Sequence, residues 1–219
     1  MTAKASSQPQ TAGRRIRGLD ATERAGQRRQ LILDAALELF ARDGYAGTSI
    51  ETLCQTAFVG NKAFYEHFST KEACYLELLQ RNTNDAVRAV TETLGRLSAD
   101  ETDGTREVIA TLVAALLDDP RVAIVTFGQA AGISPTIDRQ RRANRRESAQ
   151  LVQSVWQHFG HAGDQSRQHM LAVAVIGGLF DLISDALDRN NNSMPAAEIE
   201  QLIIDMTDFA LVTSAGLRA

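Results

Sequence analysis

The sequence contains few of the features that mark disulfide-rich, secreted or membrane-spanning proteins. Only two of its 219 residues are cysteines, Cys54 and Cys74, which are too few for a disulfide framework. The longest apolar run, residues 170–180, falls short of the roughly 18 residues that a membrane span needs. The basic N-terminal segment lacks the apolar stretch that follows in a secretory signal. We therefore expect a cytoplasmic protein without a membrane partner.

Catalytic and cofactor-binding motifs are also missing. There is no glycine-rich phosphate-binding loop, no nucleophile elbow and no convincing pair of carboxylates. The histidines of one loop region lack the spacing of zinc ligands. The possible ligands there are His158, His161, Asp164 and His169. The two cysteines fall where we expect burial, so inert packing explains them better than redox sensing. We expect no enzyme activity, no cofactor and no metal.

The charge is distributed unevenly along the chain. Residues 1–30 contain seven basic and two acidic residues, a net charge of +5, whereas the whole chain has a net charge of −4. A basic head on an acidic body suggests an anionic partner at the head. A solubilising tail is the alternative. Residues 1–22 have few large apolar groups and are predicted to form a flexible basic arm.

The apolar periodicity predicts an all-α protein of about nine helices. A helix from about Glu23 should end at Gly44, which suits a left-handed cap. Capping boxes at 48–51 and 69–72 are predicted to open a short helix and a long one that runs to about residue 97. Another short helix, 61–67, lies between them. Loops are expected at 98–104, 118–120, 132–136, 160–164 and 190–195.

The two short helices and the tight turn between them form a predicted helix-turn-helix unit at about 50–69. Aromatic residues are only 5% of the chain, yet three of them fall within residues 59–72. Phe64 and Phe68 are four residues apart, so they share the face that packs on the neighbouring helices. The opposite face can enter a major groove. There, Asn61 can read adenine, Lys62 can read guanine, and Tyr65 and His67 suit phosphates.

Residues 28–79 resemble the DNA-binding domain of TetR-family transcriptional regulators. The matching segments are "AALELFARDGYAGTSI", "FYEHF" and the "STKE" that follows it. The resemblance implies a DNA-binding domain at 23–75 and a ligand-binding and dimerisation domain at 76–219. It also implies the following DNA contacts: Thr48 and Ser49 near phosphates, Asn61, Lys62 and Ala63 at the bases, and Tyr65, His67 and Lys71 at phosphates.

The sequence departs from that family at the turn. Phe58 stands where the family usually has glycine, and Gly60 stands where it usually has serine or threonine. A left-handed backbone is costly for a residue with a Cβ, so we expect Gly60 to take the unusual angles instead. If Phe58 and Gly60 prevent this turn from forming, a second hypothesis applies. The chain would then be a helical small-molecule-binding protein whose DNA binding is weakened or lost.

Arginines at the start of the chain have two possible roles. Arg14, Arg15 and Arg17 precede the first helix and could follow a minor groove, or they could belong to a solvated tail. Arg24, Arg28 and Arg29 lie on the first helical turns and could contact phosphates.

The C-terminal region is predicted to form a homodimer. Residues 170–180 are apolar on every side of a helix and must be covered, and a stripe of apolar residues follows the last helix. Two such helices from each subunit would make a four-helix interface. The predicted interface residues are Gly177, Gly178, Leu202, Met206 and Phe209. A two-fold dimer predicts an inverted-repeat operator; a monomer that buries these faces internally is the alternative.

A pocket for a largely apolar effector is predicted among the helices of residues 71–189. Candidate walls are Leu112, Leu116, Phe127, Trp156, Phe159, Met170 and Phe180, all of which could also be plain core. Five arginines between 139 and 146 are interpreted as a solvated face, with an anionic ligand as the alternative. The predicted function is sequence-specific DNA binding by a transcriptional regulator, a repressor that a small molecule releases from its palindromic operator.

Overall fold

The computed structural model describes residues 21–127, 133–161 and 163–217. Within these ranges the chain forms nine helices and no strands, which confirms the predicted all-α class. The predicted arm falls almost wholly on residues 1–20, which lie outside the described residues. The helices are α1 Ala21–Gly47, α2 Ile50–Thr56, α3 Asn61–His67, α4 Lys71–Leu94, α5 Glu101–Leu117, α6 Pro120–Phe127, α7 Pro135–His158, α8 Gln165–Arg189 and α9 Ala196–Ala215.

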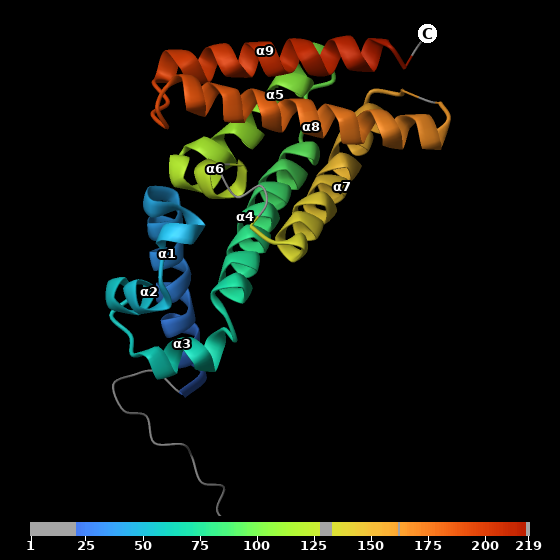
Figure 1. Cartoon of the computed structure of the whole chain (residues 1–219). Coiled ribbons are helices and arrows are strands. Elements are labelled where there is room, and N and C mark those ends of the chain that lie inside the picture. The colour runs from blue at the N-terminus through green and yellow to red at the C-terminus, as the bar shows by residue number, and fades with distance from the viewer. Residues whose placement is uncertain (1–20, 128–132, 162, 218–219) are drawn as a thin grey trace, which may run out of the picture.

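The helices form two cores, and α6 and α7 contribute residues to both. Helices α1, α2 and α3 lie together at one end of the molecule, while α8 and α9 run side by side at the other (Figure 1). The first half of α4 packs into the core of the α1–α3 unit through Tyr75 and Leu78. Helix α6 contributes Val125 to that core and Ala123 to the core formed with α5, α7, α8 and α9. A displacement of α6 therefore changes the packing of both cores.

Helix α1 is interrupted at Gly44, where the sequence predicts its end, and continues for a short stretch to Gly47. Gly44 has a φ of 73°, and Thr48 folds back beneath it. The Thr48 hydroxyl is buried and donates to the carbonyl oxygens of Gly44 and Leu39, at 2.8 and 3.3 Å. It therefore satisfies carbonyls that the end of a helix leaves without an amide partner.

Both predicted capping boxes are wrong by one residue. Ser49 caps α2 by accepting from the amide of Thr52 at 3.0 Å, and Thr70 caps α4 by accepting from the amide of Ala73 at 3.0 Å. At the first site the reason is tertiary, because the Thr48 hydroxyl is already used at the end of α1. Glu72 consequently turns elsewhere and accepts from the Ser134 hydroxyl, the N-cap of α7, at 2.6 Å.

The turn between α2 and α3 corrects the expectation about its glycine. Phe58 has a φ of 53°, whereas Gly60 has ordinary extended angles as the N-cap of α3. The Phe58 amide donates to the Gln55 carbonyl, and the Val59 amide donates to the Cys54 carbonyl. These two bonds are a Schellman motif, whose second-to-last position must be left-handed whatever residue occupies it. Because the geometry belongs to the position, Gly60 could not take over the strained conformation.

The expectation that no uninterrupted apolar run reaches the length of a membrane span stands beside a helix, α8, that is apolar over a longer window. Among the described residues, α8 is long and apolar enough to cross a membrane by length and composition. The few polar residues within it do not lower its average hydropathy enough to exclude this. In this fold, α8 packs on α6, α7 and α9, and Val175, Ile176 and Leu179 are buried in the core. A core helix of a helical body has the same length and composition.

Replacing Phe58 tests the strain at this turn. We expect Phe58→Gly to raise the free energy of unfolding by about 1 kcal/mol, because glycine removes the left-handed penalty. Phe58→Ala is the matched control: the ring is 95% exposed, so its loss removes little packing, and the Cβ remains. Urea denaturation measures both. Equal gains from glycine and alanine would show that the backbone is not the source of the effect.

Candidate DNA-binding face and ligand cavity

The buried side of α3 has the composition that the sequence predicts. Phe64 and Phe68 are almost fully buried and belong to one core with Ile32, Phe40 and Leu53. Their ring centroids are 5.6 Å apart. A seven-residue helix is too short to be stable alone, so this packing fixes its position and rotation. Its polar side is thereby held in one orientation.

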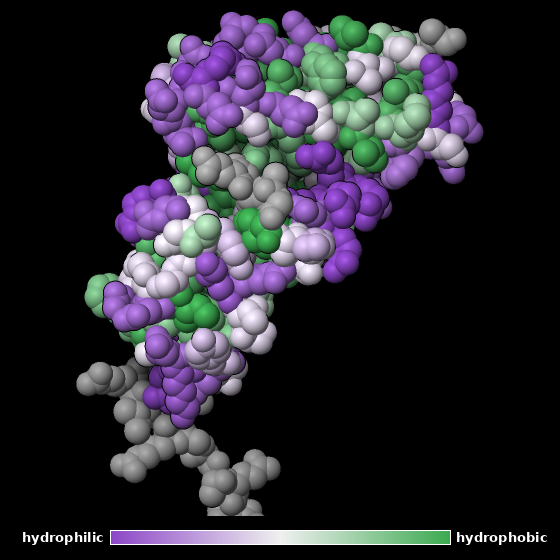
Figure 2. Space-filling model, in the orientation of Figure 1, coloured by the Kyte–Doolittle hydropathy of each residue, from purple (hydrophilic) through white to green (hydrophobic). Residues whose placement is uncertain are grey.

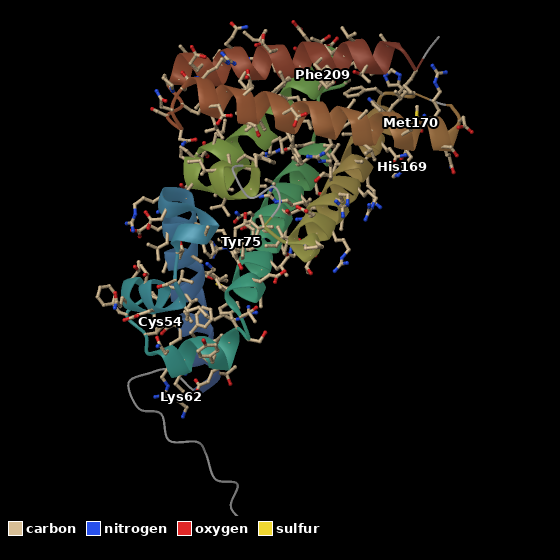
Figure 3. All side chains as sticks on the ribbon, viewed as in Figure 1. Cys54, Lys62, Tyr75, His169, Met170 and Phe209 are labelled. Carbon is tan, nitrogen blue, oxygen red and sulfur yellow. The ribbon has the colours of Figure 1, made fainter. Side chains whose placement is uncertain are left out.

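The polar side of α3 faces solvent. Asn61 is exposed, the Lys62 side chain is 92% exposed and Tyr65 is 58% exposed. Lys62 lies at the edge of ion-pair distance from Glu66, at 4.0 Å, a pairing that contributes little at an exposed site. Figure 3 shows Lys62 at the extreme end of the molecule, pointing away from the body. Ala63 beside it is half-buried. Amide, ammonium and phenol groups are thus free to meet a nucleic acid.

Lys71 does not have the position predicted for a phosphate contact. Its ammonium donates to the carbonyl oxygens of Tyr45 and Thr48, at 2.7 and 2.6 Å, and lies 4.2 Å from the centroid of the Tyr45 ring. Burial lowers the pKa of this ammonium. The junction of α1 and α2 leaves carbonyls without amide partners, and buried carbonyls must be paired. Lys71 therefore closes that junction instead of facing DNA.

Thr48 and His67 are corrected for similar reasons. The Thr48 side chain is buried under the end of α1, so it cannot reach a phosphate. His67 is half-buried, and its Nε2 is buried without a partner among the described residues. It offers at most one ring nitrogen to a phosphate. Ser49 remains exposed as the cap of α2.

The arginines on α1 differ in their exposure and in their contacts with other side chains. Arg29 forms an ion pair with Glu77 of α4, and its guanidinium lies 5.4 Å from the centroid of the Phe68 ring. Its role is therefore to join α1 to α4 and α3. Arg28 is half-buried and Arg24 is exposed. Arg14, Arg15 and Arg17 lie outside the described residues.

A cavity of about 170 Å³ lies among helices α4 to α8, with a further contribution from α9. Six of the seven residues predicted as pocket walls line it: Leu112, Leu116, Phe127, Trp156, Phe159 and Phe180. The prediction for Met170 is wrong, because this residue is 62% exposed on the outer side of α8. The inner side of that helix instead presents Val175, Ile176 and Leu179 to the cavity.

Among the polar groups of the cavity, Arg141 and Arg145 belong to the arginine cluster that the sequence indicates. Asn144 of α7 donates to the Thr83 hydroxyl of α4 at 2.8 Å. Arg141, one turn earlier, donates through Nη2 to the Tyr75 hydroxyl at 3.1 Å and to the Val125 carbonyl at 3.3 Å. Burial raises the pKa of the Tyr75 hydroxyl, and Arg141 opposes that rise. The spacing of these residues in the sequence could have shown that one face of α7 lines the cavity. The residues on that face are Arg141, Asn144, Ser148 and Val155.

The predicted dimer interface is only partly placed at the surface. Leu202 and Met206 are buried in the core of their own chain, so these two predictions are wrong. Gly178 is explained within the chain as well, because a Cβ there would come within 2.8 Å of the Phe209 ring. Gly177, by contrast, faces open space, and Phe209 is partly exposed.

The outward side of α8 and α9 remains uncovered. Its exposed residues include Met170, Ala174, Ile204, Phe209 and Val212. Figure 2 shows apolar residues gathered over the C-terminal half of α9 and the adjoining part of α8, and Figure 3 places Met170 and Phe209 at the end of the molecule opposite Lys62. We call this surface the α8–α9 face.

The cysteines are buried and unbonded, in agreement with a packing role. Burial raises the pKa of the Cys74 thiol to about 12, which makes its reactive thiolate scarce at neutral pH. No group of three or more potential metal ligands occurs in the part of the chain that the structure describes.

The fold and the α3 face define a helix-turn-helix DNA-binding protein with a helical body that contains a cavity. Residues 32–78 match the sequence model of the family described as "Bacterial regulatory proteins, tetR family". The chain is 35% identical over 86 residues to the HTH-type transcriptional activator FasR of Mycolicibacterium smegmatis, covering 39% of this chain and 37% of FasR. It is 32% identical over 66 residues to the HTH-type transcriptional repressor DhaR of Mycobacterium sp. strain GP1, covering 30% and 33%.

Solved structures extend the likeness to the whole fold. FadR from Bacillus halodurans superposes with a TM-score of 0.70 at 16% identity, covering 84% of this chain and 94% of that one. FadR from Bacillus subtilis in complex with stearoyl-CoA also gives 0.70, at 15% identity, covering 85% and 98%. The aligned regions span about a third of FasR and of DhaR. Together these matches place residues 32–78 in the tetR family of bacterial regulatory proteins and give the whole chain the fold of FadR.

The corrected role of Lys71 can be tested by removing its charge. We expect Lys71→Met to lower the free energy of unfolding by roughly 2 kcal/mol, because two carbonyls lose a charged donor. Lys62→Met, which removes the same charge from an exposed site, should change stability by less than about 0.5 kcal/mol. Thermal unfolding followed by circular dichroism measures both. Equal stability of the two variants would show that Lys71 does not stabilise the α1–α2 junction.

Proposed function

We propose that this protein is a homodimeric transcriptional repressor that a largely apolar small molecule releases from an inverted-repeat operator in the cytoplasm. The observation that carries the proposal is the α3 face. Asn61, Lys62 and Tyr65 are exposed on a helix whose other side is locked into a core by Phe64 and Phe68. Rigid placement of a few polar side chains is what base recognition requires.

The turn argues against the alternative of a helical binder that has lost DNA binding. Although Phe58 replaces the usual glycine, both Schellman hydrogen bonds form and Gly60 caps α3 in an extended conformation. The strain reduces stability without displacing the recognition helix. DNA contact is therefore assigned to Ser49, Asn61, Lys62, Ala63 and Tyr65, with Arg28 as an outlying contact.

Dimerisation is supported by the α8–α9 face. Met170 and Val212 are exposed apolar residues on adjacent helices, and a Cβ at Gly177 of α8 would meet nothing within 4 Å. A glycine facing outward in a helix costs about 1 kcal/mol relative to alanine, which the close approach of a partner helix would offset. Two copies related by a two-fold axis would present two α3 helices to two half-sites.

Release by a ligand is supported by the position of the cavity. Helix α4 contributes Tyr75 to the core beneath α3, and Asn82, Ala86 and Val90 to the cavity wall. A ligand that prefers one position of α4 necessarily shifts the DNA-binding equilibrium, by as much as its affinities for the two positions differ. The complex of FadR with stearoyl-CoA supports a ligand with a long apolar chain for a protein of this fold.

Base reading is tested by selecting bound duplexes from a random pool with the wild-type protein and with Lys62→Ala. We expect the wild type to enrich an inverted repeat, and Lys62→Ala to relax the preference at one position of each half-site at a cost of about 1–3 kcal/mol. Arg42→Ala is the control, since it removes the same charge from an exposed site on α1 outside the α3 face. No enriched repeat with the wild type would favour the binder without DNA function, and an unchanged preference would remove Lys62 from the reading residues.

The α8–α9 face is tested by placing a charge within it. Val212→Glu should shift the protein from dimer to monomer in sedimentation equilibrium, because a carboxylate would have to be buried without a partner at the interface. Leu31→Glu is the control, since Leu31 is also an exposed apolar residue but lies on α1. A dimer that survives Val212→Glu at micromolar concentration would place the interface elsewhere.

A further inference from the structure

Arg141 is incompletely paired in the wall of a mainly apolar cavity. Its Nη2 has two neutral acceptors, the Tyr75 hydroxyl and the Val125 carbonyl. Its Nε is buried and has no acceptor among the described residues. A buried N–H of a guanidinium that lacks an acceptor costs more than a neutral donor does. The group persists at that cost, which points to an acceptor that is present when the cavity is filled.

No carboxylate of the described chain supplies that acceptor. Arg141 forms no ion pair within 4.0 Å among the described residues. The acids that line the cavity are Glu101 and Asp181. Glu101 is bonded to His161 and Ser214, and Asp181 is exposed on α8. The segment 128–132, which follows α6, has the sequence GQAAG and contains no acid.

Arg141 differs from the other arginines of α7. Arg139, Arg142 and Arg146 are exposed and do not line the cavity. Arg145 is exposed but also lines the cavity, one helical turn from Arg141. The prediction of a solvated arginine face is therefore correct for most of this helix and wrong for Arg141. Two guanidinium groups on neighbouring turns of α7 therefore line the cavity.

The cavity is elongated. Its wall follows one face of α7 through Arg141, Ser148 and Val155, a distance of about 21 Å at the rise of an α-helix. The middle of the wall is apolar, with Leu112, Val152 and Trp156 among its residues, and polar side chains return at the far end, where Glu101 and Ser214 are bonded to each other. Such a shape favours a linear chain over a compact ring system.

We propose that the cavity binds a linear amphipathic acid, whose unbranched apolar chain lies between α4, α5, α7 and α8 and whose anionic head is held by Arg141. The proposal deepens the proposed function, because it assigns a chemical class to the effector. A charge-assisted bond between a guanidinium and an anion is the strongest hydrogen bond available in such a site. A neutral chain would leave the Nε of Arg141 unpaired.

The anionic head of this ligand would be bound by Arg141 where the two cores meet. The acceptors of Arg141 are the Tyr75 hydroxyl, which belongs to the core beneath α3, and the Val125 carbonyl of α6, which also accepts from Tyr75 at 2.8 Å. An anion that draws the guanidinium toward the cavity weakens these bonds. The ligand charge, and not only the ligand volume, thereby acts on the DNA-binding domain.

Binding can be measured without DNA, because Trp156 is the single tryptophan of the chain and lines the cavity. Its fluorescence is titrated with decanoate, with 1-decanol and with decanoyl-CoA, in the wild type, in Arg141→Gln and in Arg146→Gln. We expect decanoate or decanoyl-CoA to bind the wild type roughly tenfold or more tightly than decanol. Arg141→Gln should abolish that preference, and Arg146→Gln should retain it.

The three probes separate the possible outcomes. The anion whose affinity falls selectively in Arg141→Gln identifies the source of the head, a free acid or a CoA ester. Undiminished decanol binding by Arg141→Gln shows that the cavity of the variant is still folded. The proposal is overturned if decanol binds the wild type as tightly as both anions, or if Arg141→Gln keeps the preference. Anion binding that leaves the affinity for a selected duplex unchanged would instead contradict release by ligand, and would leave this inference standing.

Discussion

One carbonyl oxygen, that of Val125, joins the two halves of this protein. It accepts a hydrogen bond from Tyr75 of α4 and another from Arg141 of α7, so that three helices meet at one atom. The Tyr75 ring in turn packs edge-on against Phe40 and Tyr45 of α1, with centroids 5.2 and 5.3 Å away. Because packed rings and buried hydrogen bonds have few alternative arrangements, a change at this carbonyl cannot be absorbed locally.

Local signals in the sequence were sufficient for α3 and its surroundings. The spacing of Phe64 and Phe68 fixes which side is buried, and that in turn fixes the exposure of Asn61, Lys62 and Tyr65. Helix α1 is interrupted at Gly44 for an equally local reason. Such predictions succeed because helical periodicity and glycine caps depend on residues within a few positions of each other.

Several errors lie where a contact outside the helix decides between equivalent local choices. Two adjacent hydroxyls can each cap a helix, and Ser49 does so because Thr48 is held under α1. Similarly, four of the five arginines on α7 are exposed, but the rotation of that helix against α4 turns Arg141 inward. The sequence predicts Lys71 as a phosphate contact, but its ammonium instead binds the carbonyl oxygens of the α1–α2 junction. No spacing rule within one element contains this information.

The length of α4 determines how a small change in the cavity reaches DNA. Its 24 residues make a rod of about 36 Å. Its N-terminal end lies next to α3, and its C-terminal half lines the cavity. A rotation of about 5° around the cavity end would therefore move the other end by about 3 Å, roughly two residues of helical rise. In a dimer held together through the α8–α9 face, the two α3 helices would move by that amount relative to the fixed spacing of two half-sites. A ligand that prefers one tilt of this rod changes DNA affinity by as much as its affinities for the two tilts differ. The contact between Arg141 and Tyr75 lies near the end of the rod that adjoins α3.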